Sequence, residues 1–222
     1  MGKLKMLLRS LLFILTALSG VQALAQPLNC IAGAGVATLL RAESYTDYVG
    51  DVLISCTGGD PNQVSFVNID IFLNTNITSQ PLATNATDTE ALLIIDEARP
   101  DVMNLANNRQ YQGQVRGIPG VSPGTGPGPG MTGSGNIYVG QRMLGSSNRI
   151  TWNGVPIVPP PPGSARTLRI TNVRADATRF PVQSNQTPGV VSMFLSASPA
   201  TSLPLGNSQI RVGTVVPSVE MT

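Results

Sequence analysis

The residues best suited to chemistry in this sequence are carboxylates gathered around one apolar run. Asp96 and Glu97 directly follow residues 91–95, and Asp88, Glu90 and Asp101 lie nearby. Two carboxylates that converge can hydrolyse a glycosidic bond or coordinate calcium. Adjacent residues of a strand point to opposite faces, however, so Asp96 and Glu97 are poorly placed to act on one bond. We therefore expect a solvated strand end and assign no catalytic or metal-ligating residue; calcium binding and carboxylate catalysis are kept as alternatives.

Two short motifs match enzyme signatures by letter but lack the setting that their chemistry needs. Residues 120–124 fit the G-x-S-x-G pattern of a nucleophilic serine, and residues 128–133 fit the G-x-G-x-x-G pattern of a dinucleotide-binding loop. The sequence contains no histidine, so a Ser-His-Asp triad, a Cys-His pair and a His-ligated zinc site are excluded. Both matches lie in a Gly/Pro-rich stretch without the flanking strand and helix that these motifs require. We predict no cofactor and no enzymatic activity.

Cys30 and Cys56 are the only two cysteines. Two cysteines cannot complete a four-ligand metal site, and no histidine is present to help. An even number of cysteines in an exported chain indicates a disulfide formed in an oxidising compartment. We therefore predict one Cys30–Cys56 bridge.

The first 25 residues have the layout of a secretory signal peptide. Lys3, Lys5 and Arg9 precede a mostly apolar stretch of about a dozen residues, and small residues end the segment before a cut between Ala25 and Gln26. The apolar stretch is shorter than the roughly 20 residues that cross a bilayer, so we expect no membrane span after cleavage. The expected location is secreted or at the cell surface, with the periplasm as a variant.

Removal of this segment changes the charge balance. The remaining chain, residues 26–222, has 11 arginines, no lysine and 12 acidic residues, a formal net charge of −1. It therefore lacks a lysine for a Schiff base or for a phosphate-binding loop. The arginines are scattered rather than gathered in a basic stripe, so nucleic acid is not an expected partner.

Short apolar runs separated by Gly, Pro, Asn, Asp and Ser indicate an all-β chain. Within residues 67–73, Val67, Ile69, Ile71 and Leu73 share one face of an extended strand. Phe66 falls out of phase with them, which predicts a bulge or a strand edge there. We predict a single domain over residues 26–222, an antiparallel β-sandwich of about 8–10 short strands. The runs are 36–41, 48–56, 64–73, 91–95, 109–115, 137–144, 149–152, 165–173, 190–197 and 209–216.

The connecting segments are rich in turn-forming residues. Residues 57–62 predict a hairpin turn between the strand ending at Cys56 and the strand starting near Val64. Residues 117–135 hold eight Gly and four Pro and predict a flexible loop without regular structure. The four prolines 159–162 predict a polyproline II segment. We expect both Pro-rich segments to face solvent.

The aromatic residues are candidates for carbohydrate binding, because exposed rings can form platforms for ligands. Most of them lie in or beside the expected strands, where packing in the core is the simpler interpretation. Tyr45 and Tyr48 are the candidate exposed pair. Residues 76–78, 85–87 and 185–187 also fit the N-glycosylation sequon.

Three segments carry a resemblance to known proteins. Residues 39–62 (LLRAESYTDYVGDVLISCTGGDPN), 69–79 (IDIFLNTNITS) and 168–175 (LRITNVRA) resemble a group of uncharacterised, secreted, β-rich bacterial proteins. The resemblance covers about a third of residues 26–222, and its motifs are structural in type. It implies a bacterial surface or extracellular protein and supplies no catalytic residues.

Together these features predict a secreted or cell-surface structural or adhesive β-sandwich module without enzymatic activity. Its expected partners are other surface proteins or extracellular polymers. The alternatives are a pilin-like assembly subunit, which would add a strand to a partner's sheet edge, and a secreted carbohydrate-active or calcium-binding protein.

Overall fold

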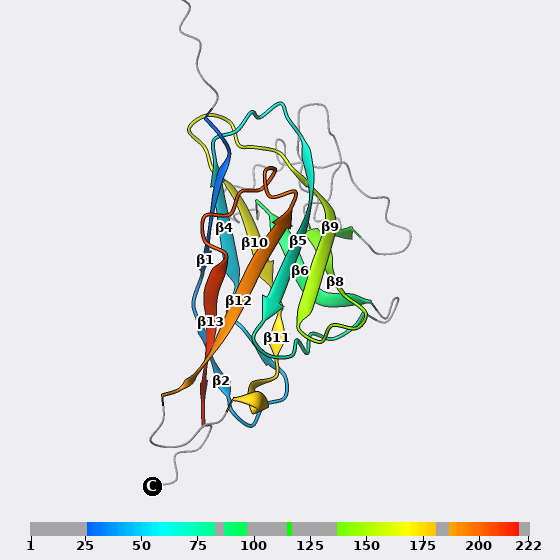
Figure 1. Ribbon diagram of the computed structural model, residues 1–222, viewed down its shortest axis with the longest axis vertical. Helices are drawn as coiled ribbons and strands as arrows, with labels where there is room; N and C mark the ends of the chain where they lie inside the picture. The colour runs from blue at the N-terminus through cyan, green and yellow to red at the C-terminus, as the bar shows by residue number, and fades with distance from the viewer. Residues whose placement is uncertain (1–25, 83–86, 97–114, 117–136, 181–186, 218–222) are drawn as a thin grey trace, which may run out of the picture.

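The computed structural model describes residues 26–82, 87–96, 115–116, 137–180 and 187–217 (Figure 1). In this part of the chain the regular structure is β-strand, apart from one short 3-10 turn, η1 (Ala177–Arg179). The strands are β1 (Asn29–Ala34), β2 (Thr38–Arg41), β3 (Asp47–Tyr48), β4 (Val52–Thr57), β5 (Ser65–Leu73), β6 (Asp88–Ile95), β7 (Val115–Arg116), β8 (Ile137–Arg142), β9 (Arg149–Ile157), β10 (Arg166–Thr171), β11 (Arg174–Ala175), β12 (Gly189–Ser198) and β13 (Gln209–Val216).

Eleven of these strands form one continuous sheet. Its order is β1-β4-β10-β6-β8-β9-β5-β12-β13-β2, with β7 paired to β8, while β11 and β3 form a separate two-stranded sheet. All pairs in the large sheet are antiparallel except β13–β2 and β7–β8. A twisted sheet of this size has to curl, split or flatten to cover its apolar face. In Figure 1 the sheet curls, so that β13, β12, β5 and β9 cross in front of β4, β10, β6 and β8.

The all-β prediction is confirmed, but the large sheet is a curled half-barrel rather than two separate sheets. The β8–β9 pairing, which is limited to Gln141–Thr151 and Arg142–Ile150, joins the two halves. At the opposite side the Gly50 N–H donates to the Val212 carbonyl at 2.7 Å, linking the segment before β4 to β13. These main-chain hydrogen bonds join the two halves into one sheet. The predicted sandwich had no such connection between its two sheets.

The hydrophobic core fills the inside of the curl, and strand alternation places it there. In β4, Val52, Ile54 and Cys56 are buried while the residues between them are exposed. The prediction for β5 is confirmed, since its residues 67, 69, 71 and 73 are buried on one face. The single tryptophan, Trp152 of β9, is 1% exposed and lies within this core.

The predicted hairpin between β4 and β5 is wrong. β4 pairs with β1 and β10, whereas β5 pairs with β9 and β12. Residues 57–62 do turn, with Gly58 and Gly59 at φ of +76° and +83°, but the chain then crosses from one half of the sheet to the other. Turn composition identifies a reversal of the chain and does not identify which strands pair.

An irregularity lies next to Phe66, as predicted, although the extra residue belongs to the neighbouring strand. The β5–β9 register runs from Val67–Val155 to Ile69–Trp152, so β9 contains one more residue than β5 in this interval. Gly154 at φ of +60° provides the left-handed conformation that such a bulge uses. Phe66 is out of phase because its side chain is on the outer face, 61% exposed.

The prediction that the proline segment faces solvent is wrong for its first half. Val158, Pro159 and Pro160 are buried, and only Pro161 and Pro162 are exposed. A Cβ atom added to Gly59 would lie 2.6 Å from the Pro159 Cβ, which shows how closely this segment packs on the turn after β4. Packing against that glycine turn buries prolines that composition alone assigns to the surface. The predicted loop 117–135 lies outside the described residues, as does the predicted strand 109–115 except for Val115, which belongs to β7.

Candidate functional site

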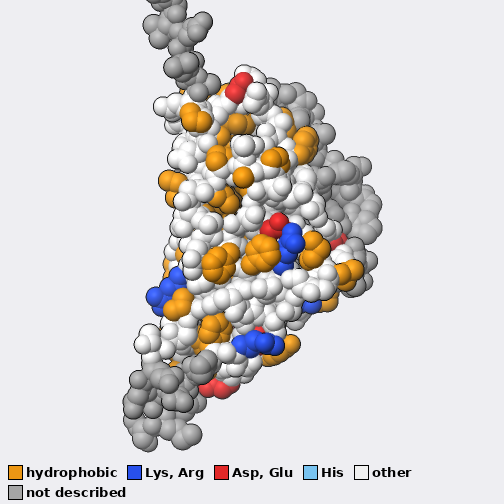
Figure 2. Space-filling model, in the orientation of Figure 1, with side chains coloured by type: hydrophobic (Ala, Val, Ile, Leu, Met, Phe, Trp, Pro, Cys, Tyr) orange, Lys and Arg blue, Asp and Glu red, His pale blue; other side chains and the backbone are white. Residues whose placement is uncertain are grey.

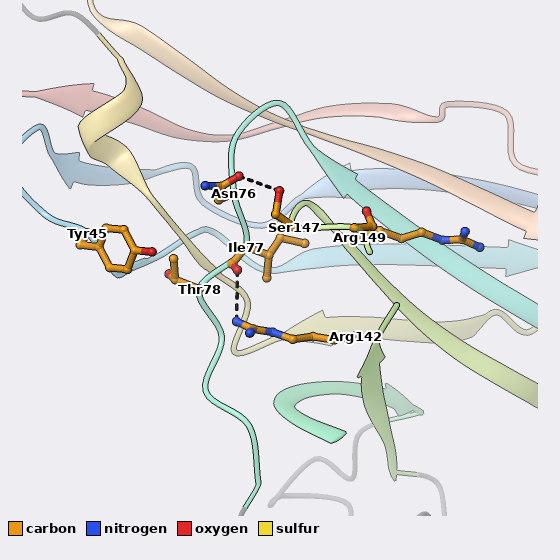
Figure 3. Close-up of a pocket in the computed structure, with 8 residues that line it drawn as sticks. Tyr45, Asn76, Ile77, Thr78, Arg142, Ser147 and Arg149 are labelled. Carbon is orange, nitrogen blue, oxygen red and sulfur yellow. Dashed lines mark hydrogen bonds between the residues drawn. The ribbon is translucent and has the colours of Figure 1, made fainter. Parts of the chain in front are cut away.

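A cavity of about 340 Å³ lies at one end of the curled sheet (Figure 3). Three segments surround it: the connection after β5, the hairpin between β8 and β9, and the loop between β2 and β3. We call this cavity the Arg142 pocket. Its lining includes the side chains of Tyr45, Asn76, Thr78, Arg142, Ser146 and Ser147.

Local turn chemistry and main-chain hydrogen bonds fix the two longer segments against each other. In the β8–β9 hairpin, Gly145 at φ of +86° allows a tight turn that is closed by a 3.1 Å bond from the Ser146 N–H to the Met143 carbonyl. The Ile77 N–H donates to the Ser147 carbonyl at 2.8 Å. The Asn148 side chain donates to the Leu73 carbonyl at 2.9 Å. The walls of the pocket are therefore defined by hydrogen bonds between chain segments far apart in sequence.

Arg142, the last residue of β8, is half-buried at the wall of the pocket. Its guanidinium donates to the Ile77 carbonyl at 3.2 Å and to the Ser79 carbonyl at 2.9 Å. The Arg142 Nε and the Thr78 hydroxyl are shielded from solvent and have no hydrogen-bond partner among the described residues. Shielded polar atoms of this kind are uncommon in folded proteins, because each one loses its hydration without replacement.

The pocket has a positive charge without a lining carboxylate among the described residues. A second arginine, Arg149, also contributes to the lining, but its Nε and a terminal nitrogen donate to Asp70 at 3.0 and 2.8 Å. Figure 3 shows the Arg149 guanidinium pointing away from the other lining residues. Arg142, in contrast, forms no ion pair with a carboxylate in the described part of the chain. The uncompensated charge at the pocket is that of Arg142.

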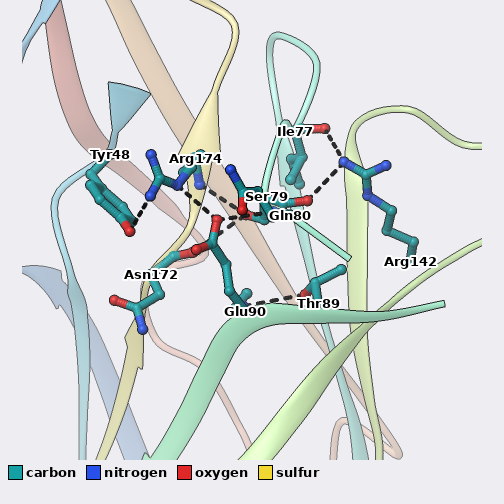
Figure 4. Close-up of polar contacts among 10 residues, drawn as sticks. Tyr48, Ile77, Ser79, Gln80, Thr89, Glu90, Arg142, Asn172 and Arg174 are labelled. Carbon is teal, nitrogen blue, oxygen red and sulfur yellow. Dashed lines mark hydrogen bonds and ion pairs between the residues drawn. The ribbon is translucent and has the colours of Figure 1, made fainter. Parts of the chain in front are cut away.

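A polar cluster behind the pocket holds its wall in place (Figure 4). The Arg174 Nε donates to Glu90 at 2.7 Å, and the same guanidinium stacks over the Tyr48 ring, 3.6 Å from its centroid. Glu90 also accepts from the Gln80 N–H at 2.9 Å, while the Ser79 hydroxyl accepts from the Arg174 N–H at 2.9 Å. Residues 79 and 80 directly follow the pocket segment, so this cluster fixes the segment's second end.

The carboxylates singled out in the sequence do not converge. Asp88 and Glu90 lie in β6 and Asp96 lies just after it; at about 3.3 Å per residue, Glu90 and Asp96 are roughly 20 Å apart along the chain. Asp88 accepts from Gln141 at 3.0 Å, and Asp96 forms a 2.9 Å ion pair with Arg166. Asp96 is thus held by an arginine rather than only by solvent. Glu97 and Asp101 lie outside the described residues.

The predicted disulfide is present. Cys30 of β1 and Cys56 of β4 are directly opposite each other in the antiparallel register, and both are fully buried. The bridge links the edge strand to the body of the sheet, which is a structural role and is compatible with an oxidising compartment. Of the predicted cleavage residues, Gln26 is the first described residue and Ala25 lies outside the described part.

The aromatic residues divide into core and surface groups. Core packing is confirmed for Tyr138 and Trp152, which are 3% and 1% exposed. Tyr45 and Tyr48 are both exposed, at 65% and 46%, yet only Tyr45 lines the pocket, because Tyr48 is stacked on Arg174. Phe66 is also exposed, at 61%, on the outer face of β5.

A second surface feature crosses the outer face of the sheet. Phe194 of β12, Phe72 of β5 and Arg149 of β9 are successive cross-strand neighbours, and Arg149 lies over the Phe72 ring at 5.3 Å. Figure 2 shows hydrophobic side chains beside a basic and an acidic group in the middle of this face. These three side chains form a flat row, and the Arg149 charge is already paired with Asp70. The row is therefore less suited than the pocket to bind a charged ligand.

Sequence reasoning identified Tyr45 but missed the other main pocket residues. Asn76 and Thr78 were noted only as part of a sequon, and in the structure the Asn76 amide lies 2.8 Å from the Ser147 hydroxyl. Arg142 was one scattered arginine among several. The available signal was the density of Asn, Ser and Thr in residues 74–79 and 146–148, which indicates polar loops without indicating that they meet.

Comparison with known proteins adds no family assignment. No family model and no curated protein matches the chain. Among solved structures, the chain is similar to the crystal structure of BslA, a bacterial hydrophobin, with 9% identity, coverage of 90% of this chain and 100% of that chain, and a TM-score of 0.26. A similarity of this size carries no argument about function. The fold and the site together define an all-β protein with one internal disulfide and a cationic surface pocket.

No helix in the described part of the chain is long and apolar enough to cross a membrane. No group of three or more His, Cys, Asp or Glu side chains is arranged there to hold a metal ion.

Proposed function

We propose that this protein is a secreted or cell-surface adhesive module that binds an extracellular polymer without acting as an enzyme. The observation that carries the proposal is the Arg142 pocket, where the exposed Tyr45 ring lies beside hydroxyl, amide and guanidinium groups. Binding sites for small polar groups combine an apolar or aromatic surface with a few placed hydrogen-bonding groups. A tyrosine ring supplies contact area on one side and a polar hydroxyl on the other. A sugar unit of a polymer fits that combination.

The charge pairing of the carboxylates supports a binding role rather than acid-base catalysis. Asp51, Asp70, Glu90, Asp96 and Asp176 each lie within 3.5 Å of an arginine nitrogen. A carboxylate that is hydrogen-bonded to a guanidinium is occupied by that partner and is not free to approach a substrate bond. These residues therefore act in our proposal as structural partners of the arginines.

The buried disulfide and the signal-peptide pattern support the proposed location. A bridge between paired strands persists in oxidising surroundings, and the N-terminal residue pattern is that of exported proteins.

The proposal is tested by binding to a panel of extracellular polysaccharides in affinity gel electrophoresis. We expect at least one polymer to retard the protein and Tyr45→Ala to weaken that retardation by about tenfold, as for loss of an aromatic contact in a binding pocket. Phe66→Ala is the matched control, since Phe66 is equally exposed but lies outside the pocket. Equal loss in both variants, or no retardation by any polymer, would contradict the proposal.

A pilin-like assembly subunit is the second candidate, and one observation favours it. Among the described residues, β2 is a terminal strand of the large sheet and pairs only with β13; Leu39 in β2 and Val36 just before it are 73% and 79% exposed. An exposed edge strand with apolar neighbours can accept a strand from another chain. Light scattering over a range of concentrations tests this: growth in mass favours assembly, and a single monomeric mass rejects it.

A further inference from the structure

The Arg142 guanidinium is the feature of the pocket that the fold explains least. Six other arginines of the described chain, at positions 41, 149, 166, 169, 174 and 179, have a carboxylate within 4.0 Å. Arg142 is half-buried in a pocket whose lining contains no carboxylate among the described residues, and its guanidinium donates to two neutral main-chain carbonyls. Removing a guanidinium from water without an opposite charge is costly, so such groups are normally paired.

The rest of the lining is suited to an oxyanion that carries a sugar. The Ser147 hydroxyl accepts from the Asn76 amide at 2.8 Å in the favoured orientation of that amide, which leaves its proton for an anionic oxygen, whereas the Ser146 hydroxyl already donates to Asn148 at 3.1 Å. The Asn76 side chain adds an amide, and the Tyr45 side chain adds an exposed ring for the uncharged part of a ligand. Arginine binds carboxylate and sulfate oxygens strongly because its planar nitrogens match their spacing.

We infer that the Arg142 pocket binds the oxyanion of an acidic saccharide, either a uronate carboxylate or a sulfate ester. This inference rests on the proposed adhesive function and specifies its ligand. Arg142 supplies the charge, the Ser147 hydroxyl supplies a hydrogen bond, and Tyr45 contacts the sugar ring. The cluster around Arg174 and Glu90 keeps the pocket segment in position and does not contact the ligand.

The inference is tested by isothermal titration calorimetry with three probes of equal length: an oligogalacturonate, a sulfated galacto-oligosaccharide and a neutral galacto-oligosaccharide. We expect one or both acidic probes to bind and the neutral probe to bind about tenfold more weakly or not at all, as for loss of a charge-assisted hydrogen bond. The better of the two acidic probes identifies the oxyanion. Equal binding of all three overturns the inference.

The matched variants remove one positive charge inside or outside the pocket. Arg142→Gln is expected to weaken acidic-probe binding by about tenfold or more. Arg211→Gln is the control, because the Arg211 side chain is exposed and bonded to Thr214 rather than to the pocket. Equal affinities of the two variants overturn the inference, since they would show a general charge effect.

Loss of folding is separated from loss of binding by thermal unfolding of each variant. If Arg142→Gln does not fold, Arg142→Lys and Ser147→Ala replace it; both are expected to weaken acidic-probe binding several-fold, and wild-type affinity in both overturns the inference. The two proposals fail differently. Polymer retardation that depends on Tyr45 but not on the acid group keeps the adhesive function and rejects the oxyanion, whereas absence of all binding rejects both.

Discussion

At the scale of single residues, charge pairing is the main organising feature of the described surface. The pairs join residues far apart in the chain, such as Arg169 with Asp51 at 2.6 Å and Arg174 with Glu90 at 2.7 Å. A partly exposed pair contributes only about 0–1 kcal/mol, so these contacts orient segments more than they stabilise the fold. Arg142 lines the pocket without such a pair among the described residues, and the proposed oxyanion would provide the missing opposite charge.

Asp47 provides a pH-dependent test at this scale. Burial alone would raise the pKa of its carboxyl, but hydrogen bonds from the Arg41 N–H, the Ser44 hydroxyl and the Arg41 guanidinium, together with the Arg41 charge, hold the pKa below its usual range. A group whose pKa is lower in the folded state stabilises the protein above its unfolded-state pKa, near 4 for aspartate, and loses that effect as the pH falls through the folded-state value.

We therefore expect wild type to be more stable than Asp47→Asn at neutral pH, with the difference shrinking below about pH 4. Urea unfolding of both proteins across this range measures it. A difference in unfolding free energy that stays constant down to low pH would show that the Asp47 charge is not involved.

At the scale of elements, close main-chain contacts decide where the sheet curls. Gly50 lies between β3 and β4, at the point where this part of the chain meets β13. A Cβ atom at this position would overlap the Val36 carbonyl oxygen and lie 3.0 Å from the Val212 carbonyl oxygen. The absence of a side chain is thus a requirement of the contact.

Gly50→Ala is expected to destabilise the protein by about 1–3 kcal/mol, because backbone rather than a flexible side chain has to move. Gly33→Ala in β1 is the matched control, since its Cβ would meet nothing within 4 Å, and we expect a change within about 0.5 kcal/mol. Urea midpoints measure both. Similar losses in the two variants would mean that the effect comes from glycine removal in general.

At the scale of the whole molecule, the large sheet surrounds one core in the described part of the chain. The buried apolar residues of the described chain, except Val139 and Val158, form a single cluster contributed by both halves of the sheet. Neither half can separate without exposing that cluster to water, so the fold is expected to unfold as one unit.

This expectation is checked by following urea unfolding with two signals. Far-ultraviolet circular dichroism reports the strands, and fluorescence of Trp152, the only tryptophan, reports the core. We expect the two curves to coincide. Separate midpoints would show that the halves of the curled sheet unfold independently.

The sequence alone determined most of the longer strands of the described chain and which of their faces are apolar. Alternation is a local property, so β4, β5, β12 and β13 could be identified from short runs, and the even number of cysteines identified the bridge. β1 was missed because small residues and glycine weaken its pattern. The same local signals assigned a solvent-facing proline segment that packing partly buries.

Only the tertiary structure decided the order of the strands and the existence of the pocket. β4 pairs with β10 rather than with β5, although β5 follows it in the chain, because pairing depends on how distant segments share the core. Tyr45, Asn76 and Arg142 meet for the same reason. The residue pattern of a strand predicts the face on which each side chain lies. The neighbours of that side chain on other strands depend on how the whole sheet closes.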